Sequence, residues 1–175
     1  IALVGESGCG KSTLALLLMG LEDPTDGTVI FEGQDITHLN DNQRKGLRRK
    51  IQMVFQDPYE SLNPTQTIEE IILEPLQVHG IGDAAERNER VTKALEDAGL
   101  KPAETYMKRY PHELSGGQRQ RVVIASALVL EPEVIIADEP VSMLDVSIRA
   151  EVINLLAELR ITRQIAVIFI THDLG

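Results

Sequence analysis

Hydrophobic and polar positions along the chain form two patterns, short apolar runs and longer stretches with helical spacing. The apolar runs predict buried strands, and the run at 28–31, followed by Glu32 and Gly33, predicts one arm of a hairpin. Strands are therefore expected at 1–4, 28–31, 51–55, 134–137 and 165–170. Helices are expected at 11–18, 40–50, 67–78, 83–99, between Pro102 and Pro111, at 119–130 and after Asp145.

The order of these elements predicts an α/β fold with a mainly parallel sheet and a small antiparallel β element. Residues 63–110 carry only helical patterns, so we expect an inserted helical subdomain between core segments 1–62 and 111–175. The chain begins without Met and ends just after a strand, which indicates that 1–175 is a fragment of a single domain whose N- and C-terminal parts are missing. Exposed sheet edges would then make the fragment poorly stable alone.

Composition narrows the possible classes of protein. Hydrophobic residues make up 43% and charged residues 25% of the chain, which is typical of a globular protein, and no apolar run reaches the roughly 18 residues of a membrane-spanning helix. The net charge of −10 argues against nucleic acid as a partner. The basic stretch at 44–50 is either a solvated face or a local anion-binding patch.

The segment from Gly5 to Ser12 matches the phosphate-loop pattern G-x-x-x-x-G-K-[ST] between a strand and a helix. Its backbone N–H groups and the helix N-terminus would bind phosphate, Lys11 would reach the β- and γ-phosphates, and Ser12 would be a ligand of Mg²⁺. The alternative is a chance glycine-rich turn. The pattern predicts a P-loop NTPase core in which the nucleotide contacts Gly5, Ser7, Gly8, Cys9, Gly10, Lys11, Ser12 and Thr13.

Cys9 is the one cysteine of the chain and excludes an internal disulfide. The simpler interpretation is that the loop requires a small side chain at this position. Because a helix N-terminus lowers the pKa of a thiol, redox control of the loop is the alternative.

Polar residues follow three of the predicted strands, at the sheet edge where ligands bind in open α/β folds. Gln56 is placed to meet a metal or phosphate, Asp138 suits the Mg²⁺ shell, and Glu139 could activate water. The two carboxylates could instead cap the next turn, and a lone His172 after a strand is usually structural. Because Gln56, Asp138, Glu139 and His172 share this edge of the sheet, we favour a ligand-binding site.

A second anion site is indicated at Leu114–Gln118. Ser115 and Gln118 have capping-box spacing, and Gly116 and Gly117 leave the helix entrance sterically bare. One phosphate loop already accounts for the phosphates of one nucleotide, so the second site needs an explanation.

Together, the segment GESGCGKS, Gln56, LSGGQ, the strand IIADE, Ser142–Asp145 and His172 resemble the nucleotide-binding domain of ABC transporters. LSGGQ is the specific mark, and the resemblance covers essentially the whole chain. It implies ATP and Mg²⁺ as ligands and a second ABC ATPase domain as partner.

The resemblance also implies a role for each motif. Two domains would associate head to tail, so that Ser115, Gly116, Gly117 and Gln118 of one chain cap the γ-phosphate held by Lys11 of the other. Asp145 would cross to the opposite phosphate loop. Gln56 would contact Mg²⁺ and the attacking water, Glu139 would be the general base, and His172 would contact the γ-phosphate.

A narrower similarity, in residues 54–64, 110–114 and 138–148, is to the importers of oligopeptides, dipeptides and nickel. Met143 replaces the Ala usual in that group. The similarity implies an ATPase subunit at the cytoplasmic face of the membrane, with transmembrane permease subunits as partners and an extracellular substrate-binding protein as an indirect one. The adenine-stacking residue of the family lies upstream of the phosphate loop, outside this chain.

Two other kinds of ABC ATPase remain as alternatives, a DNA-maintenance machine and a soluble translation factor. DNA-maintenance ATPases commonly carry a long coiled coil between the phosphate loop and the LSGGQ segment, which is called the signature. Here roughly 100 residues without heptads separate the two motifs, which disfavours that alternative.

Overall fold

A computed structural model describes residues 1–6 and 8–172 of the chain. Its strands are β1 (Ala2–Val4), β2 (Ile30–Phe31), β3 (Gln34–Asp35), β4 (Ile51–Val54), β5 (Val134–Asp138) and β6 (Ala166–Thr171). Its helices are α1 (Lys11–Leu18), α2 (Asp41–Lys50), α3 (Pro58–Ser61), α4 (Ile68–His79), α5 (Ala84–Asp97), α6 (Glu104–Met107), the 3₁₀ turn η1 (Pro111–Glu113), α7 (Gly116–Leu128) and α8 (Val146–Thr162).

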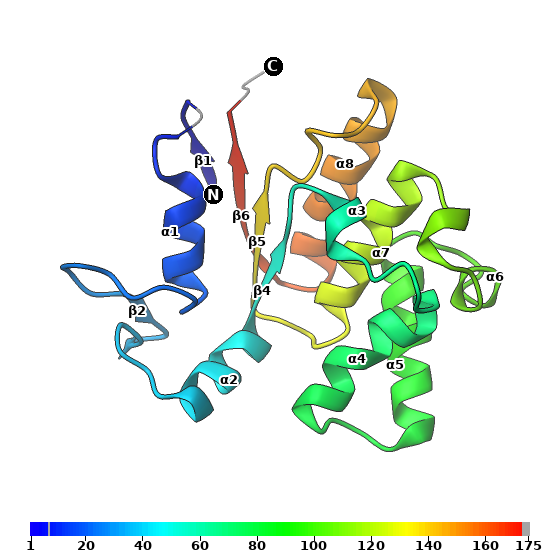
Figure 1. Cartoon of the computed structure of the whole chain (residues 1–175), viewed down its shortest axis with the longest axis horizontal. Helices are drawn as coiled ribbons and strands as arrows, with labels where there is room; N and C mark the ends of the chain where they lie inside the picture. Colours follow the sequence, from blue (N-terminus) through cyan, green and yellow to red (C-terminus); the bar gives the residue numbers. More distant parts are fainter. Residues whose placement is uncertain (7, 173–175) are drawn as a thin grey trace.

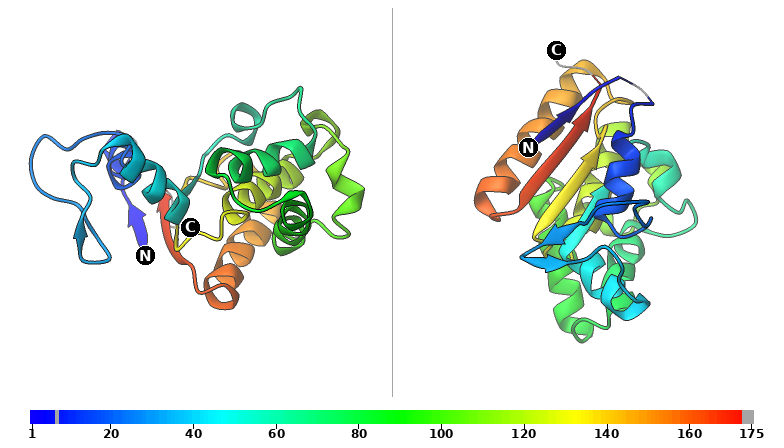
Figure 2. Two further views of the ribbon diagram at one scale, coloured as in Figure 1. Left: turned by 90° about the horizontal axis from the view of Figure 1, so that it is seen from below. Right: turned by 90° about the vertical axis from the view of Figure 1, so that its left-hand side faces the viewer.

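The central sheet is parallel, with strand order β1-β6-β5-β4, and β2 and β3 form a separate antiparallel pair. Figure 1 shows the sheet near the middle of the molecule, with α1 and the β2–β3 pair on one side and α4 to α8 on the other. The second view in Figure 2 shows β1, β6 and β5 side by side and pointing the same way. The predicted α/β class, parallel sheet and small antiparallel element are confirmed.

The two faces of the sheet bury different sets of side chains, because neighbouring residues of a strand point to opposite faces. In β5, Ile135 and Ala137 belong to the apolar cluster shared with α4, α5, α7 and α8. Ile136 belongs to the cluster that contains Ala15 of α1 and Leu47 of α2. The continuous apolar run predicted at 134–137 is therefore explained by burial on both faces.

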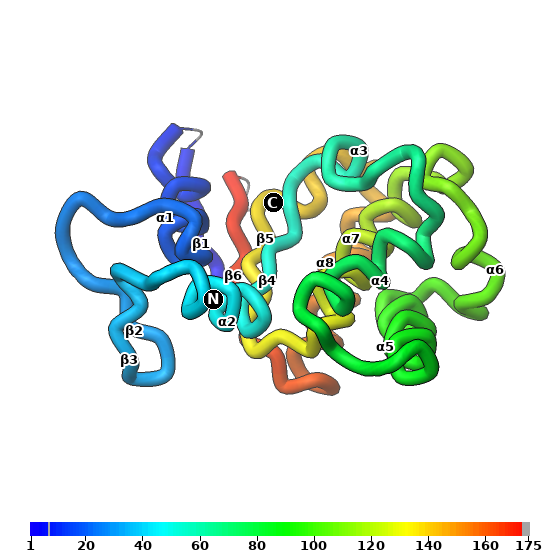
Figure 3. Tube along the Cα trace, turned by 60° about the horizontal axis from the view of Figure 1, so that its bottom comes forward, coloured from blue at the N-terminus to red at the C-terminus, as the bar shows by residue number. Residues whose placement is uncertain are grey.

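Residues 63–110 are helical wherever they are regular, and they form the side of the molecule farthest from the β2–β3 pair (Figure 3). Their apolar side chains, such as Ile72 and Leu95, share one cluster with Val122 of α7 and Val152 of α8. The boundaries drawn for a helical subdomain stay a prediction.

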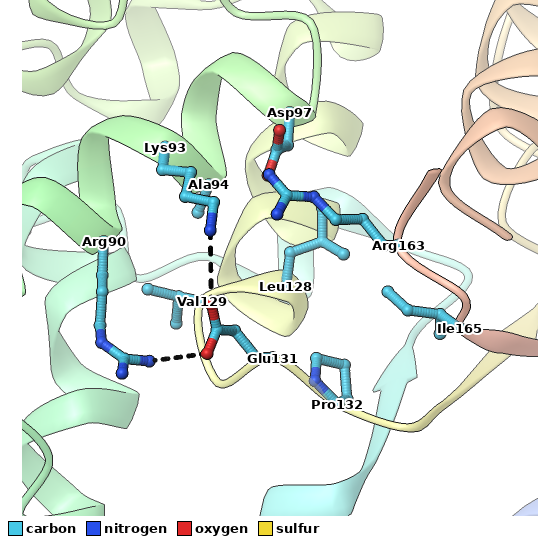
Figure 4. Close-up of a pocket in the computed structure, with 10 residues that line it drawn as sticks. All are labelled: Arg90, Lys93, Ala94, Asp97, Leu128, Val129, Glu131, Pro132, Arg163 and Ile165. Carbon is cyan, nitrogen blue, oxygen red and sulfur yellow. Dashed lines mark hydrogen bonds and ion pairs between the residues drawn. The ribbon is translucent and has the colours of Figure 1, made fainter. Parts of the chain in front are cut away.

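Ion pairs tie α5 to the turns that precede β5 and β6 (Figure 4). Glu131, in the turn before β5, accepts from Arg90 at 3.2 Å and from Lys93 at 3.5 Å. Arg163, in the turn before β6, pairs with Asp97 at the end of α5. The helical segment is thus joined to the end of the sheet opposite the predicted site.

Several predicted helix boundaries move by a few residues. The helix expected at 119–130 begins at Gly116, because Ser115 caps it directly and both signature glycines enter its first turn. Asp145 occupies the N-cap position of α8, but its side chain makes no capping hydrogen bond.

Candidate functional site

The phosphate loop turns sharply before α1. Gly8 has φ 82° and Gly10 has φ 94°, and glycine adopts this left-handed backbone at little cost. A Cβ at Gly5 would lie 2.7 Å from Sγ of Cys9, so Gly5 leaves the room that the loop needs. Ser7 lies outside the described residues.

Lys11 directs its charge into this loop. Its side chain is buried, and Nζ donates to the carbonyl oxygens of Gly5 and Glu6, both at 2.8 Å, with Sγ of Cys9 at 3.8 Å. Phosphate oxygens are stronger acceptors for an ammonium group than neutral carbonyls. The buried cation at the N-terminus of α1 therefore fits an anionic phosphate chain.

An open cavity of about 530 Å³ lies in front of the loop. Residues from the loop side and from the ends of three sheet strands meet in it, as expected for a parallel α/β sheet. The lining residues are Gly8, Gly10, Lys11, Ser12, Thr13, Gln56, Glu139 and His172.

Glu139 is the centre of the polar network across the cavity. Its Oε2 accepts from Nε2 of Gln56 at 3.2 Å, and its Oε1 lies 2.8 Å from Nδ1 of His172. The side chain of Glu139 is 16% exposed, against 52% for His172. The Glu139 carboxylate therefore bonds to Gln56 and His172, which follow two other strands of the sheet.

The backbone of Glu139 is left-handed, with φ 47°. Such a conformation is unfavourable for a residue with a side chain and persists only where surrounding contacts impose it. Here the Glu139 N–H donates to the carbonyl of Ile170 at 2.9 Å, and the Ser142 hydroxyl donates to the carbonyl of Glu139 at 3.1 Å. These bonds hold the backbone of Glu139 in this conformation, with the side chain lining the phosphate-loop cavity.

Asp138 ends β5 beside Ile170 of β6 and lines a second hollow, which adjoins the first at Gln56. Ser12, Gln56 and Asp138 offer oxygen ligands, the type that Mg²⁺ prefers. Within residues 1–6 and 8–172, no three His, Cys, Asp or Glu side chains are grouped to hold a metal. A magnesium ion held there would complete its octahedral shell with waters or phosphate oxygens.

The second predicted anion site lies elsewhere in the chain. Ser115 and Gln118 form a reciprocal capping box at the start of α7, and a Cβ at Gly117 would lie 2.6 Å from Ile148. Ser115, Gly116, Gly117, Gln118 and Asp145 do not line the phosphate-loop cavity. Because α1 and α7 cover opposite faces of the sheet (Figure 1), these residues do not complete the site of their own chain.

Sequence reasoning missed two features of the site, the left-handed backbone of Glu139 and the bonds from Lys11 to the loop carbonyls. No signal in the sequence marks either one. Both depend on how β6 and the loop surround these residues.

A parallel α/β sheet with a phosphate loop before α1 and carboxylates at the end of β5 defines a P-loop nucleotide-binding protein. Within that class, the chain belongs to the ABC transporter family, whose model matches residues 1–142.

Two relatives from Bacillus subtilis (strain 168) show the similarity in sequence. The oligopeptide transport ATP-binding protein AppF is 54% identical over 100% of this chain and 53% of its own length. The putative oligopeptide transport ATP-binding protein YkfD is 51% identical over 99% of this chain and 52% of its own length. The chain thus spans about half the length of these curated relatives.

Solved structures show the similarity in fold. CbiO1 from Clostridium perfringens, part of the ABC transporter complex cbiONQ, matches 98% of this chain and 66% of its own with a TM-score of 0.87 and 34% identity. The ATP-binding cassette MJ0796, as a dimer in a post-hydrolysis state with ADP and Pi, matches 99% of this chain and 74% of its own with a TM-score of 0.84 and 35% identity. Among the described residues, no helix has the length and apolar character needed to cross a bilayer.

Proposed function

We propose that the chain binds and hydrolyses ATP and powers an ABC importer of oligopeptides or dipeptides, or of nickel. The relatives named for oligopeptide transport support the importer class over the translation-factor and DNA-maintenance alternatives. The observation that carries the proposal is the Glu139 carboxylate, held by Gln56 and His172 across a cavity from the phosphate loop.

Binding begins with the groups of the loop. Lys11 exchanges its bonds to the carbonyls of Gly5 and Glu6 for the β- and γ-phosphate oxygens of ATP, and the N–H groups at the start of α1 bind the same anion. Ser12, Gln56 and Asp138 would hold Mg²⁺, which would neutralise phosphate charge when bound. ATP as the nucleotide is supported by the family and by the ADP bound to MJ0796.

Hydrolysis depends on Glu139 as general base. Its carboxylate takes a proton from the attacking water, while Gln56 and His172 keep the carboxylate and the γ-phosphate in position. The left-handed backbone of Glu139 fixes the orientation of its carboxylate before substrate binds, so the carboxylate needs little reorganisation in the transition state.

The complete site requires two chains. Ser115, Gly116, Gly117 and Gln118 of one chain cap the γ-phosphate held by the other, and Asp145 crosses the same interface. The opposite placement of α1 and α7 and the dimeric structures of MJ0796 support this head-to-tail arrangement.

Substitution of Glu139 tests the function. Glu139→Gln keeps the shape of the side chain but removes the base, so ATP binding is expected to remain and kcat to fall about 10²- to 10⁴-fold. Nucleotide binding and phosphate release measure the two steps. Glu74→Gln, at an exposed position of α4, is the matched control. Turnover of Glu139→Gln within about threefold of wild type contradicts the assignment of the base.

Partners test the transport class. Affinity purification from solubilised membranes is expected to recover permease subunits. The proposal assigns the protein to the cytoplasmic face of the membrane, where it would bind these subunits, with the extracellular substrate-binding protein joined through them. Recovery of ribosomes or DNA in place of permeases overturns the importer proposal and favours one of the two alternatives.

A further inference from the structure

A short helix connects the phosphate-loop cavity to α7, whose first turn carries the LSGGQ signature, residues 114–118. Helix α3 follows Gln56 after one residue and packs against α7. Asp57 caps α3, with Oδ1 accepting the N–H of Tyr59 at 2.7 Å. The position of Tyr59 is therefore tied to that of Gln56.

The side chain of Tyr59 reaches the first turn of α7. The centroid of its ring lies 4.2 Å from the guanidinium carbon of Arg119. Its hydroxyl would lie 3.8 Å from a Cβ added at Gly116. The residue is 60% exposed. Burial of an apolar surface thus does not explain a large aromatic side chain at this position, whereas contact with α7 does.

Arg119 is itself held in place. Its Nε donates to the carbonyl of Pro111 at 2.7 Å, and its backbone N–H donates to the carbonyl of Ser115 at 2.9 Å. The guanidinium that stacks on Tyr59 thus belongs to the same turn as the signature residues. A displacement of α3 would be transmitted to that turn.

We propose that Tyr59 and Arg119 are a positioning pair that sets the signature turn of α7 relative to Gln56. The pair links two parts of the molecule. One is Gln56, which lies beside Glu139; the other is the first turn of α7, where Ser115 and Gly116 meet the nucleotide of the partner chain. The inference rests on the proposed function, because it concerns the two-chain site. Neither residue touches ATP.

The test separates positioning from folding. Tyr59→Leu removes the ring, and Arg119→Gln removes the charge; each is expected to lower kcat about tenfold. Binding of ATP to the single chain uses its own phosphate loop and is expected to stay within about twofold of wild type. The urea midpoint is expected to stay at the wild-type value. Tyr59→Phe, which retains the ring, is expected to restore at least about half of the wild-type kcat.

Dimerisation gives an independent readout. With Glu139→Gln as background, ATP-driven dimerisation is expected to weaken about tenfold in Tyr59→Leu. The double variant Tyr59→Leu, Arg119→Gln is expected to be no weaker than Arg119→Gln alone, because Arg119→Gln already removes the contact with Tyr59 together with the bond to the Pro111 carbonyl. Tyr110→Leu is the matched control, since Tyr110 is another partly exposed aromatic and stacks on His112.

Three outcomes overturn the inference. They are wild-type kcat in Tyr59→Leu, equal losses in Tyr59→Leu and Tyr110→Leu, and additive losses in the double variant. Failure of the proposed function is distinguishable, because it appears as undiminished turnover in Glu139→Gln, whatever the result at Tyr59.

Discussion

Gln120 is the polar side chain whose environment stands out at the scale of single residues. It is fully buried in α7, and among the described residues neither its amide nitrogen nor its amide oxygen has a hydrogen-bond partner. A buried amide without partners loses its hydration and gains nothing in return. Gln120 is therefore expected to cost stability relative to an apolar side chain of similar volume.

Replacement of this amide is expected to stabilise the protein. Gln120→Met keeps most of the side-chain volume and removes the desolvation cost, so the free energy of unfolding should rise by about 1–3 kcal/mol. Urea titration measures the change. Gln77→Met, at an exposed position of α4, is the control and should stay within about 0.5 kcal/mol. A loss of stability in Gln120→Met would show that the amide has a hydrogen-bond partner, such as a buried water.

At the scale of elements, capping boxes define where several helices begin. They occur at Asn40 with Gln43, at Thr67 with Glu70 and at Ser115 with Gln118. In each box the N-cap side chain accepts from the backbone N–H of the third helical residue, and the side chain of that residue accepts from the backbone N–H of the N-cap residue. Both bonds satisfy N–H groups that the helix leaves free. Two of these boxes use a neutral amide at the third position, and one uses a carboxylate.

The carboxylate makes the start of α4 sensitive to pH. Hydrogen bonds from the backbone and then the side chain of Thr67 lower the pKa of Glu70. Since the folded-state pKa lies below the unfolded one, the contribution of Glu70 to stability is present near neutral pH and lost as pH falls through the folded pKa. The stability advantage of wild type over Glu70→Gln is expected to shrink between about pH 6 and pH 3.

Urea midpoints at several pH values measure this difference. Glu74→Gln, on the exposed side of the same helix, is the control for a general effect of charge. A wild-type advantage over Glu70→Gln that stays constant across this range contradicts the role given to the ionised cap.

At the scale of the whole molecule, the sheet separates the two halves of the proposed ATP site. The loop before α1 lies with Ala15 on one face, and α7 packs with Val122 on the other. The ion pairs of α5 join it to the turns before β5 and β6, at the opposite end of the sheet. Under the proposed function, the phosphate loop and the signature turn of one chain therefore belong to different ATP sites of a dimer.

Mixing two inactive variants tests this sharing. Lys11→Ala removes the phosphate loop's cation, and Ser115→Phe blocks the signature turn, so each alone should be inactive. In a random mixture half of the dimers contain one intact site, and activity should return to about a quarter of wild type. Steady-state ATPase assays at varied mixing ratios measure the recovery, and Lys11→Ala with added wild type calibrates it. No recovery in the mixture contradicts the head-to-tail site.

The local motifs were predictable from sequence because neighbours along the chain create them. Gly8 and Gly10 have the left-handed backbone that the loop pattern requires, and the capping boxes at Thr67 and Ser115 lie where the spacing indicates. The strand ends that carry Gln56 and Glu139 were likewise visible as apolar runs followed by polar residues. These features need only interactions within a few residues.

Sequence by itself therefore determined the class of fold, the phosphate loop and the candidate side chains at the sheet edge. Tertiary structure alone decided that Glu139 takes a left-handed backbone and meets Gln56, 83 positions away, and His172, 33 positions away. It also decided that the signature turn lies across the sheet from the phosphate loop. The physical reason is that strand order and the packing of helices on two faces bring distant residues together, and no local pattern specifies that order.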